Sequence, residues 1–184
     1  MYDVKQYASN ELPVEIAAQF ASFVRLVWLS HLKGEDRFWT LIDPTGVTQH
    51  FVISERGVLI THVAVGQRRI EHLGESYDLY TLGGVFTYPA FRGEGHGQRA
   101  VDAASDYIRQ GTGDMGMLFC VPERWNFYGR SGWQHLKAAI TFGDPAAPQA
   151  STDEPVMILP ISSKVEAHRA DFERAPIYVG VHTW

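Results

Sequence analysis

The fold is decided by the stretch Leu82-Gly83-Gly84-Val85-Phe86-Thr87-Tyr88-Pro89-Ala90-Phe91-Arg92-Gly93-Glu94-Gly95-His96-Gly97-Gln98. Residues 85–88 are β-branched or aromatic, and Pro89 ends the strand that this composition predicts. Three glycines follow among polar residues. Apolar residues then recur at helical spacing, at Ala100, Val101, Ala104, Tyr107 and Ile108. The pattern predicts a strand, a glycine loop and a helix that begins inside the loop.

A glycine loop at the start of a helix is suited to binding an anion. The first backbone N–H groups of the helix lack partners, the helix dipole is positive there, and glycine lets a bulky anion approach the backbone. The stretch therefore predicts a pyrophosphate site. Gly95-His96-Gly97-Gln98-Arg99-Ala100 loosely fits a dinucleotide fingerprint, but no repeated βαβ pattern accompanies it, and the Gly-Lys-Ser/Thr of a P-loop is absent.

The rest of the chain predicts further elements of both kinds. We expect a helix from Pro13 to about His31, with an apolar face that includes Val27, followed by an antiparallel meander over 51–88. After the glycine-loop helix we expect a strand over 115–121, a short helix over 123–131, a strand from Trp133, a surface loop over 144–155 and a strand over 156–161. The expected class is α+β, in a single domain over residues 1–184.

Composition limits the classes of protein to which the chain can belong. A length of 184 residues with 45% hydrophobic content suits one globular domain. The 16 basic and 21 acidic residues give a net charge of −5, which argues against a nucleic-acid partner. With no signal-like start and no membrane-length apolar run, we expect a cytoplasmic protein. Cys120 is the only cysteine, so an internal disulfide and a cysteine metal cluster are excluded, and no metal site is expected.

The spacing Arg-x-x-Gly-x-Gly, at Arg92, Gly95 and Gly97, resembles the acyl-CoA loop of the GNAT superfamily of N-acetyltransferases. The alternative is a plain helix-capping glycine turn. A second stretch, in which Tyr128 precedes Gly132-Trp133, resembles the other half of the GNAT cofactor site. The resemblance implies that the following residues contact acetyl-CoA: Val85, Phe86, Thr87, Arg92, Gly93, Glu94, Gly95, His96, Gly97, Gln98, Asn126 and Tyr128.

The resemblance narrows to the aminoglycoside 2′-N-acetyltransferases. It is carried by Ile60-Thr61-His62-Val63-Ala64-Val65-Gly66-Gln67-Arg68-Arg69, Gly84-Val85, Arg92-Gly93, Tyr128 with Ser131-Gly132-Trp133, Leu159-Pro160-Ile161 and Trp184. The family implies a GNAT fold with a central mixed, mostly antiparallel twisted sheet flanked by helices. It also implies acetyl-CoA as donor, an amino sugar as acceptor, and a homodimer.

Acetyl transfer to an amine requires three functions. The acyl oxygen becomes an oxyanion and needs a donor, which by the resemblance is the backbone N–H near Val85. The departing thiolate needs a proton, for which Tyr128 is the candidate acid. The attacking amine must lose a proton to a base, directly or through water. Where the family has Tyr-Val-Glu-Gly-Val, this chain has Gly83 in place of the glutamate, so the candidates for the base are Glu35, Asp36 and the terminal carboxylate of Trp184.

The expected acceptor site is less acidic than in the family, because Gly83 replaces a glutamate and His182 stands where relatives carry an aspartate. Fewer anions favour a substrate with fewer ammonium groups, such as kasugamycin, which has one free amino group and a carboxyl-bearing side group. Alternatives are a GNAT enzyme for another amine, with Trp28, Trp39, Trp125 and Trp133 lining an aromatic pocket, and an acyl-CoA-binding module without catalysis. The expected substrate residues are Glu35, Asp36, Gly83, Gly84, Asp153, Glu154 and Trp184.

Overall fold

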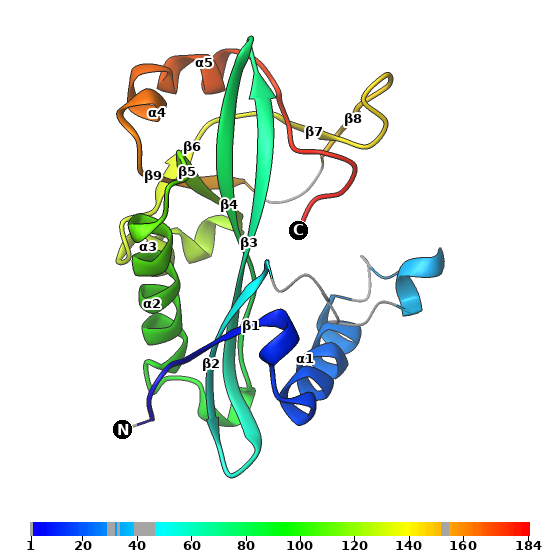
Figure 1. Ribbon diagram of the computed structural model, residues 1–184, viewed down its shortest axis with the longest axis vertical. Coiled ribbons are helices and arrows are strands. Elements are labelled where there is room, and N and C mark those ends of the chain that lie inside the picture. The colour runs from blue at the N-terminus through cyan, green and yellow to red at the C-terminus, as the bar shows by residue number, and fades with distance from the viewer. Residues whose placement is uncertain (1, 29–31, 33, 39–46, 152–154) are drawn as a thin grey trace. The chain divides into compact units, whose positions relative to one another are not determined.

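The computed structural model describes residues 2–28, 32, 34–38, 47–151 and 155–184. Within these residues the strands form a seven-stranded sheet of order β1-β2-β3-β4-β5-β9-β6 and a three-stranded sheet of order β10-β7-β8 (Figure 1). The strands are β1 Lys5–Ala8, β2 Gln49–Glu55, β3 Val58–His72, β4 Glu75–Thr87, β5 Met115–Phe119, β6 Gln134–Leu136, β7 Ile140–Phe142, β8 Gln149–Ala150, β9 Val156–Pro160 and β10 Ile177–Tyr178. The helices are α1 Val14–Val27, α2 His96–Gln110, α3 Trp125–Gly129, α4 Ser163–Ala167 and α5 Arg169–Arg174, with short 3₁₀ turns between some elements.

Two compact units make up the described chain. Unit 1 comprises Met1–Ala64 and Gly84–Ala103, and unit 2 comprises Val65–Gly83 and Ala104–Trp184. Strands β3 and β4 and helix α2 contribute residues to both. The mixed, mostly antiparallel sheet with flanking helices confirms the α+β class, while the single domain stays a prediction.

Unit 1 is built around the expected meander. Strand β1 pairs antiparallel with β2, from Lys5 opposite Val52 to Ala8 opposite Gln49. The turn from β2 to β3 consists of Arg56 and Gly57, with φ of 52° and 77°. Two successive positive φ values are those of a type I′ turn, whose twist matches that of the flanking strands. Local sequence therefore fixes the register of this hairpin.

Helix α1 covers the sheet of unit 1 with its apolar face. Pro13 precedes the first helical residue, and Ile16, Phe20 and Phe23 are buried in a cluster with β-strand residues. Val27, expected on the same face, is 54% exposed, so that part of the prediction was wrong. The helix ends at Val27, where the N–H of Trp28 closes onto the carbonyl of Val24. The other members of the cluster are Val52, Leu59 and Phe86.

In unit 2, β4 pairs in parallel with β5, from Leu79 opposite Met115 to Thr81 opposite Met117. Strand β9 lies between β5 and β6 and is antiparallel to both. The predicted surface loop over 144–155 contains β8, which pairs with β7 and was missed. Strand β8 has only two residues, which are too few for a sequence pattern to predict a strand. It forms because these residues pair with Thr141 and Phe142 of β7.

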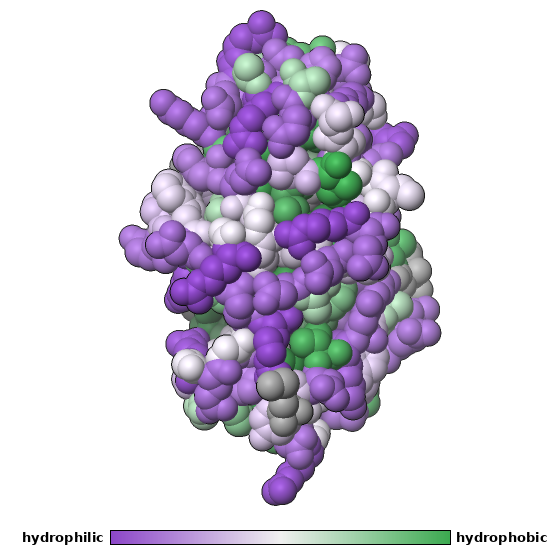
Figure 2. Space-filling model, turned by 90° about the vertical axis from the view of Figure 1, so that its left-hand side faces the viewer, coloured by the Kyte–Doolittle hydropathy of each residue, from purple (hydrophilic) through white to green (hydrophobic). Residues whose placement is uncertain are grey.

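The face of the molecule drawn in Figure 2 is mainly polar. The face that includes α2 is mainly hydrophilic, and its hydrophobic residues form small separate areas (Figure 2). No helix in the described parts of the chain is both long enough and apolar enough to cross a membrane.

The glycines that follow α2 leave room for the ring of Tyr80. A Cβ atom on Gly113 would lie 2.6 Å from Cε2 of Tyr80 and 3.1 Å from the backbone oxygen of Asp78. We expect Gly113→Ala to lower the free energy of unfolding by about 1–3 kcal/mol, because the ring and the strand must shift to admit the methyl group. Gly129→Ala is the control, since its Cβ would meet nothing within 4 Å. Urea denaturation of both variants measures the difference, and equal midpoints would contradict this account of the packing.

Candidate active site

The glycine loop has the expected geometry. A 3₁₀ turn, Pro89–Phe91, follows β4, and α2 begins at His96. Gly93 and Gly95 have φ of +85° and +78°, a region that side chains rarely adopt, and a Cβ on either would meet nothing within 4 Å. Residues 92–95 are exposed. The loop thus presents an open glycine backbone at the N-terminus of a 15-residue helix.

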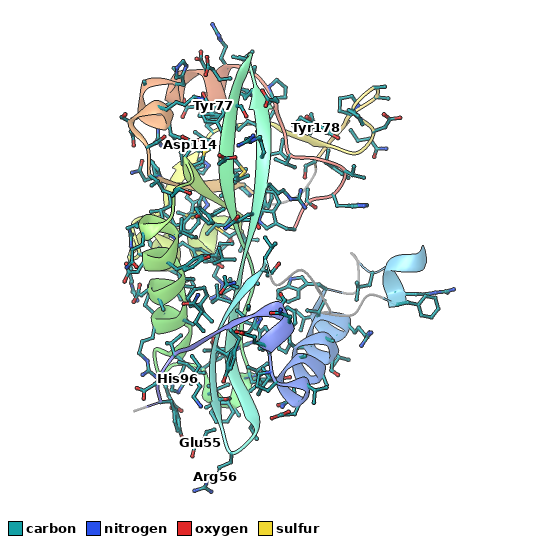
Figure 3. The ribbon with its side chains drawn as sticks, viewed as in Figure 1. Glu55, Arg56, Tyr77, His96, Asp114 and Tyr178 are labelled. Carbon is teal, nitrogen blue, oxygen red and sulfur yellow. The ribbon has the colours of Figure 1, made fainter. Side chains whose placement is uncertain are left out.

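Two side chains predicted to contact the cofactor, those of His96 and Gln98, form hydrogen bonds within α2 and the loop that precedes it. Figure 3 shows His96 at the start of the helix, where Arg99 donates to its Nδ1 at 2.7 Å and Nε2 lies 3.1 Å from Oε2 of Glu94. The ring is 5% exposed, so a neutral His96 with its proton on Nε2 satisfies both contacts. Gln98 donates to Asp102 at 3.0 Å. These two positions therefore offer an anion mainly their backbone N–H groups.

Strand β4 bends at Gly84, whose φ is +58°. Beyond it, Thr61 donates through Oγ1 to the carbonyl of Phe86 at 2.6 Å and lies 2.9 Å from Oγ1 of Thr87. The ring of Phe86 stacks on Phe23 at 3.8 Å in the core. Phe86 can therefore face a cofactor only through its backbone, whereas Val85 and Thr87 are half-buried. Arg92 donates from Nε to the carbonyl of Thr87 at 2.9 Å, which ties the loop to the end of the strand.

A pair of buried histidines behind this strand was missed by the sequence prediction. Nδ1 of His62 lies 2.8 Å from the carbonyl oxygen of Gly84, and its Nε2 lies 2.9 Å from Nδ1 of His50. Nε2 of His50 in turn lies 2.8 Å from Oγ of Ser9. Burial, and secondarily repulsion from His50, lowers the pKa of His62 from 6.5 to about 3, so the ring is neutral near pH 7. No local signal links two histidines on neighbouring strands.

Helix α3 of unit 2 carries the predicted acid. Tyr128 is 8% exposed and packs edge-on against Phe127, with ring centroids 4.9 Å apart. Its carbonyl accepts from the N–H of Ser131 at 2.9 Å, and Gly132 follows with φ of +86°. Asn126 lies two positions earlier and is exposed. The helix therefore turns Tyr128 inward and Asn126 toward solvent.

The predicted substrate residues Gly83 and Trp184 are brought together in unit 2. A Cβ on Gly83 would lie 3.2 Å from Cδ1 of Trp184. The guanidinium of Arg68 lies 5.0 Å from the centre of the Trp184 ring and donates to the carbonyls of Val179 and His182, each at 2.6 Å. Burial lowers the pKa of the Arg68 guanidinium below its ordinary value, but arginine stays charged in proteins. The sequence prediction missed this cation beside Trp184.

The remaining predictions fall outside what the structure describes. Glu35 and Asp36 lie in a 3₁₀ turn, Gly34–Phe38, but their side chains are not among the described ones, and Asp153 and Glu154 lie outside the described residues.

The described residues contain no group of three or more His, Cys, Asp or Glu side chains that could hold a metal ion. An open depression of about 390 Å³ in unit 2, lined by Arg69, Asp78 and their neighbours, contains none of the predicted site residues.

Comparison with known proteins assigns the family. The family model described as acetyltransferase (GNAT) domain matches residues 15–136. The chain is similar in structure to a conserved protein of Enterococcus faecalis V583, a probable N-acyltransferase, at 18% identity and a TM-score of 0.57. The match covers 74% of this chain and 33% of the other, so the chain spans about a third of that protein's length.

Two further structures cover this chain more fully. The GNAT family N-acetyltransferase YhbS from Escherichia coli, in complex with CoA, matches at 12% identity and a TM-score of 0.61, over 97% of this chain and 90% of its own. An aminoglycoside 6′-N-acetyltransferase complexed with coenzyme A matches at 10% identity and a TM-score of 0.58, over 87% of this chain and 97% of its own. Similarity at this level of identity establishes the fold, and the family match covers most of the chain. With its exposed glycine loop and bent strand, the chain belongs to the GNAT family of acetyl-CoA-dependent N-acetyltransferases.

Proposed function

We propose that this enzyme transfers the acetyl group of acetyl-CoA to an amino group of an aminoglycoside antibiotic, with kasugamycin as its preferred acceptor, and thereby confers resistance. The observation that carries the donor half is the pairing of a bent strand at Gly84 with an open glycine loop at Gly93 and Gly95, all within unit 1. A thioester needs an oxyanion donor beside the acyl group, and the CoA pyrophosphate needs unpaired N–H groups. We assign the oxyanion donor to the strand at Gly84 and the pyrophosphate site to the glycine loop.

The reaction assigns a role to each predicted catalytic residue. The N–H of Val85 donates to the thioester oxygen while the amine nitrogen forms a bond to the carbonyl carbon. The carbon–sulfur bond then breaks, and the hydroxyl of Tyr128 gives its proton to the departing sulfur. The amine loses its proton to a base, for which Glu35 and Asp36 remain the side-chain candidates. The products are an N-acetylated sugar and free CoA.

The acceptor is proposed from the charges near Gly83. The position where the family carries a glutamate has no side chain, and the indole of Trp184 lies against it. A guanidinium, that of Arg68, lies over the same indole. The absence of a side-chain carboxylate at position 83 weakens the binding of a second or third ammonium group, and the Arg68 guanidinium over the indole favours an acceptor that carries a carboxyl group. Kasugamycin combines a single free amino group with such a carboxyl group.

The first prediction tests the pyrophosphate loop. We expect Gly95→Val to weaken CoA binding tenfold or more, because the side chain enters the space through which phosphate reaches the backbone. Gly57→Val is the matched control, since Gly57 has φ of +77° against +78° for Gly95 and both are open. Both substitutions place valine at nearly the same positive φ, so titration calorimetry should show normal affinity for Gly57→Val alone. Equal affinities in the two folded variants would remove the loop from the site.

The second prediction concerns Tyr128. We expect Tyr128→Phe to lower kcat by about 10²–10⁴-fold with little change in KM, because a general acid acts in the transition state. Tyr178→Phe is the control (Figure 3). The hydroxyl of Tyr178 donates to the carbonyl of Gly143 at 2.6 Å, and its removal should leave kcat unchanged. Steady-state assays of CoA release measure both. An effect of Tyr128→Phe on KM alone would make Tyr128 a binding residue.

The third prediction concerns acceptor charge. We expect kcat/KM for kasugamycin to exceed that for kanamycin by tenfold or more, since two or three lost ion pairs of up to about 1 kcal/mol each suffice for that ratio. Gly83→Glu should shift the ratio toward kanamycin, although the indole of Trp184 must move by a few tenths of an ångström. Gly83→Gln crowds the indole equally without the charge and should not shift it.

Parallel assays of both antibiotics with the wild type and the two variants decide the acceptor. Turnover of kanamycin without turnover of kasugamycin would refute the kasugamycin assignment and leave an aminoglycoside enzyme. Turnover of neither, with polyamines or arylamines accepted, would refute the aminoglycoside assignment and leave a GNAT enzyme for another amine.

A further inference from the structure

We propose that His62 is a positioning residue for acyl transfer, which holds the carbonyl of Gly84 so that the N–H of Val85 is aimed at the thioester oxygen. The inference rests on the proposed role of Val85. It adds to that role a buried side chain that touches neither substrate.

The geometry follows from one peptide unit. The carbonyl of Gly84 and the N–H of Val85 belong to the same peptide, and in a trans peptide they point in opposite directions. Nδ1 of His62 lies 2.8 Å from that carbonyl oxygen. A donor that fixes the carbonyl on one side of the plane therefore fixes the direction of the N–H on the other side. Bonding at the carbonyl also polarises the amide, which strengthens the N–H as a donor.

The partners of His62 determine which nitrogen carries its proton. A carbonyl oxygen only accepts, so Nδ1 must carry the hydrogen. Nε2 is then the acceptor, and Nδ1 of His50 donates to it across 2.9 Å. The low pKa of His62, about 3, keeps this tautomer neutral throughout the range in which an amine acceptor is reactive. The ring therefore presents one fixed donor to Gly84.

The peptide is also confined by its neighbours. Gly84 has φ of +58°, and a Cβ there would lie 3.0 Å from Cζ of Phe20 and 3.4 Å from Cε1 of His62. The Phe20 ring in turn stacks on the His62 ring, with centroids 3.9 Å apart. Phe20 thus confines the plane of the imidazole, and a side chain at position 84 would have to displace Phe20 by a few tenths of an ångström. Steric confinement and the hydrogen bond fix the same peptide.

A direct role as base does not fit this residue. His62 is fully buried, and each ring nitrogen already has a partner. A general base must reach the proton that it removes within hydrogen-bond distance. His62 therefore acts through Gly84 and Val85.

The experiment is isotope-edited infrared spectroscopy of bound acetyl-CoA labelled with ¹³C at the thioester carbonyl, together with kcat and the affinity for CoA. A hydrogen bond to the thioester oxygen lowers the carbonyl stretching frequency. In His62→Phe and His62→Leu, which lack the donor, we expect the band to move up toward that of free acetyl-CoA. We expect kcat to fall about tenfold to a hundredfold, less than the loss of a whole oxyanion donor. CoA has no thioester oxygen, so its dissociation constant should stay within about twofold, as a local role at Val85 requires.

Two further variants separate positioning from packing. His62→Asn places an amide N–H near the position of Nδ1 and should return the band and kcat toward the wild type. Thr61→Val removes a donor to the carbonyl of Phe86, on the same strand but on another peptide, and should leave the band in place. His62→Leu is smaller than His62→Phe, so that at least one apolar variant fits beside Phe20.

The outcomes distinguish this inference from the function on which it rests. A shifted band in the wild type that is unchanged in folded His62→Phe or His62→Leu would overturn the role of His62 and leave that of Val85. An unshifted band in a wild type that binds acetyl-CoA would overturn both. A shift of the same size in Thr61→Val would assign the effect to the packing of the strand, and so would also overturn the role of His62.

Discussion

The positive φ of Gly84 is the constraint on which unit 1 depends. Strand residues ordinarily have negative φ, so a value of +58° interrupts the alternation of β4 and turns one peptide out of line. On one side of the bend the carbonyl of Gly84 is bonded to His62, and after it the ring of Phe86 returns to the core against Phe23. One strand can therefore anchor the hydrophobic core and still present an N–H that is not aligned with its neighbours.

The fold was predictable where its signals are local. The hairpin turn at Arg56-Gly57, the end of β4 at Pro89 and the stop of α2 before Gly111 follow from the conformations that glycine and proline allow. The exposure of Val27 depends on where the core ends beneath α1, and β8 exists because β7 lies beside it. Such features depend on the neighbours that the finished fold supplies, which residue periodicity does not encode.

The candidate site likewise has parts that the sequence could predict and parts that it could not. The glycine loop and Tyr128 with Gly132 are contiguous motifs, so the sequence alone indicated them. The contacts of Arg68 with Val179 and His182 span more than a hundred residues, at separations of 111 and 114. His50 and His62 meet because β2 and β3 are neighbours, and in a strand of alternating apolar residues each would be interpreted as an ordinary core position. Family resemblance marked the stretch that contains His62 and Arg68 but gave neither residue a role.

The choice of histidine at position 62 can be understood from what the peptide needs. The Gly84 carbonyl requires a donor in a space closed by Phe20, where a lysine or arginine would lose its hydration. A neutral imidazole fills that space with an aromatic ring, donates through Nδ1 and accepts from His50 through Nε2. A buried neutral histidine also makes the stability of the fold depend on pH. With a folded pKa of about 3 against 6.5, the unfolded chain binds a proton before the folded chain does. The stability associated with the neutral ring is complete above pH 6.5 and declines as the pH falls toward 3. The geometry that serves the acyl oxygen near neutral pH therefore makes unit 1 sensitive to acid.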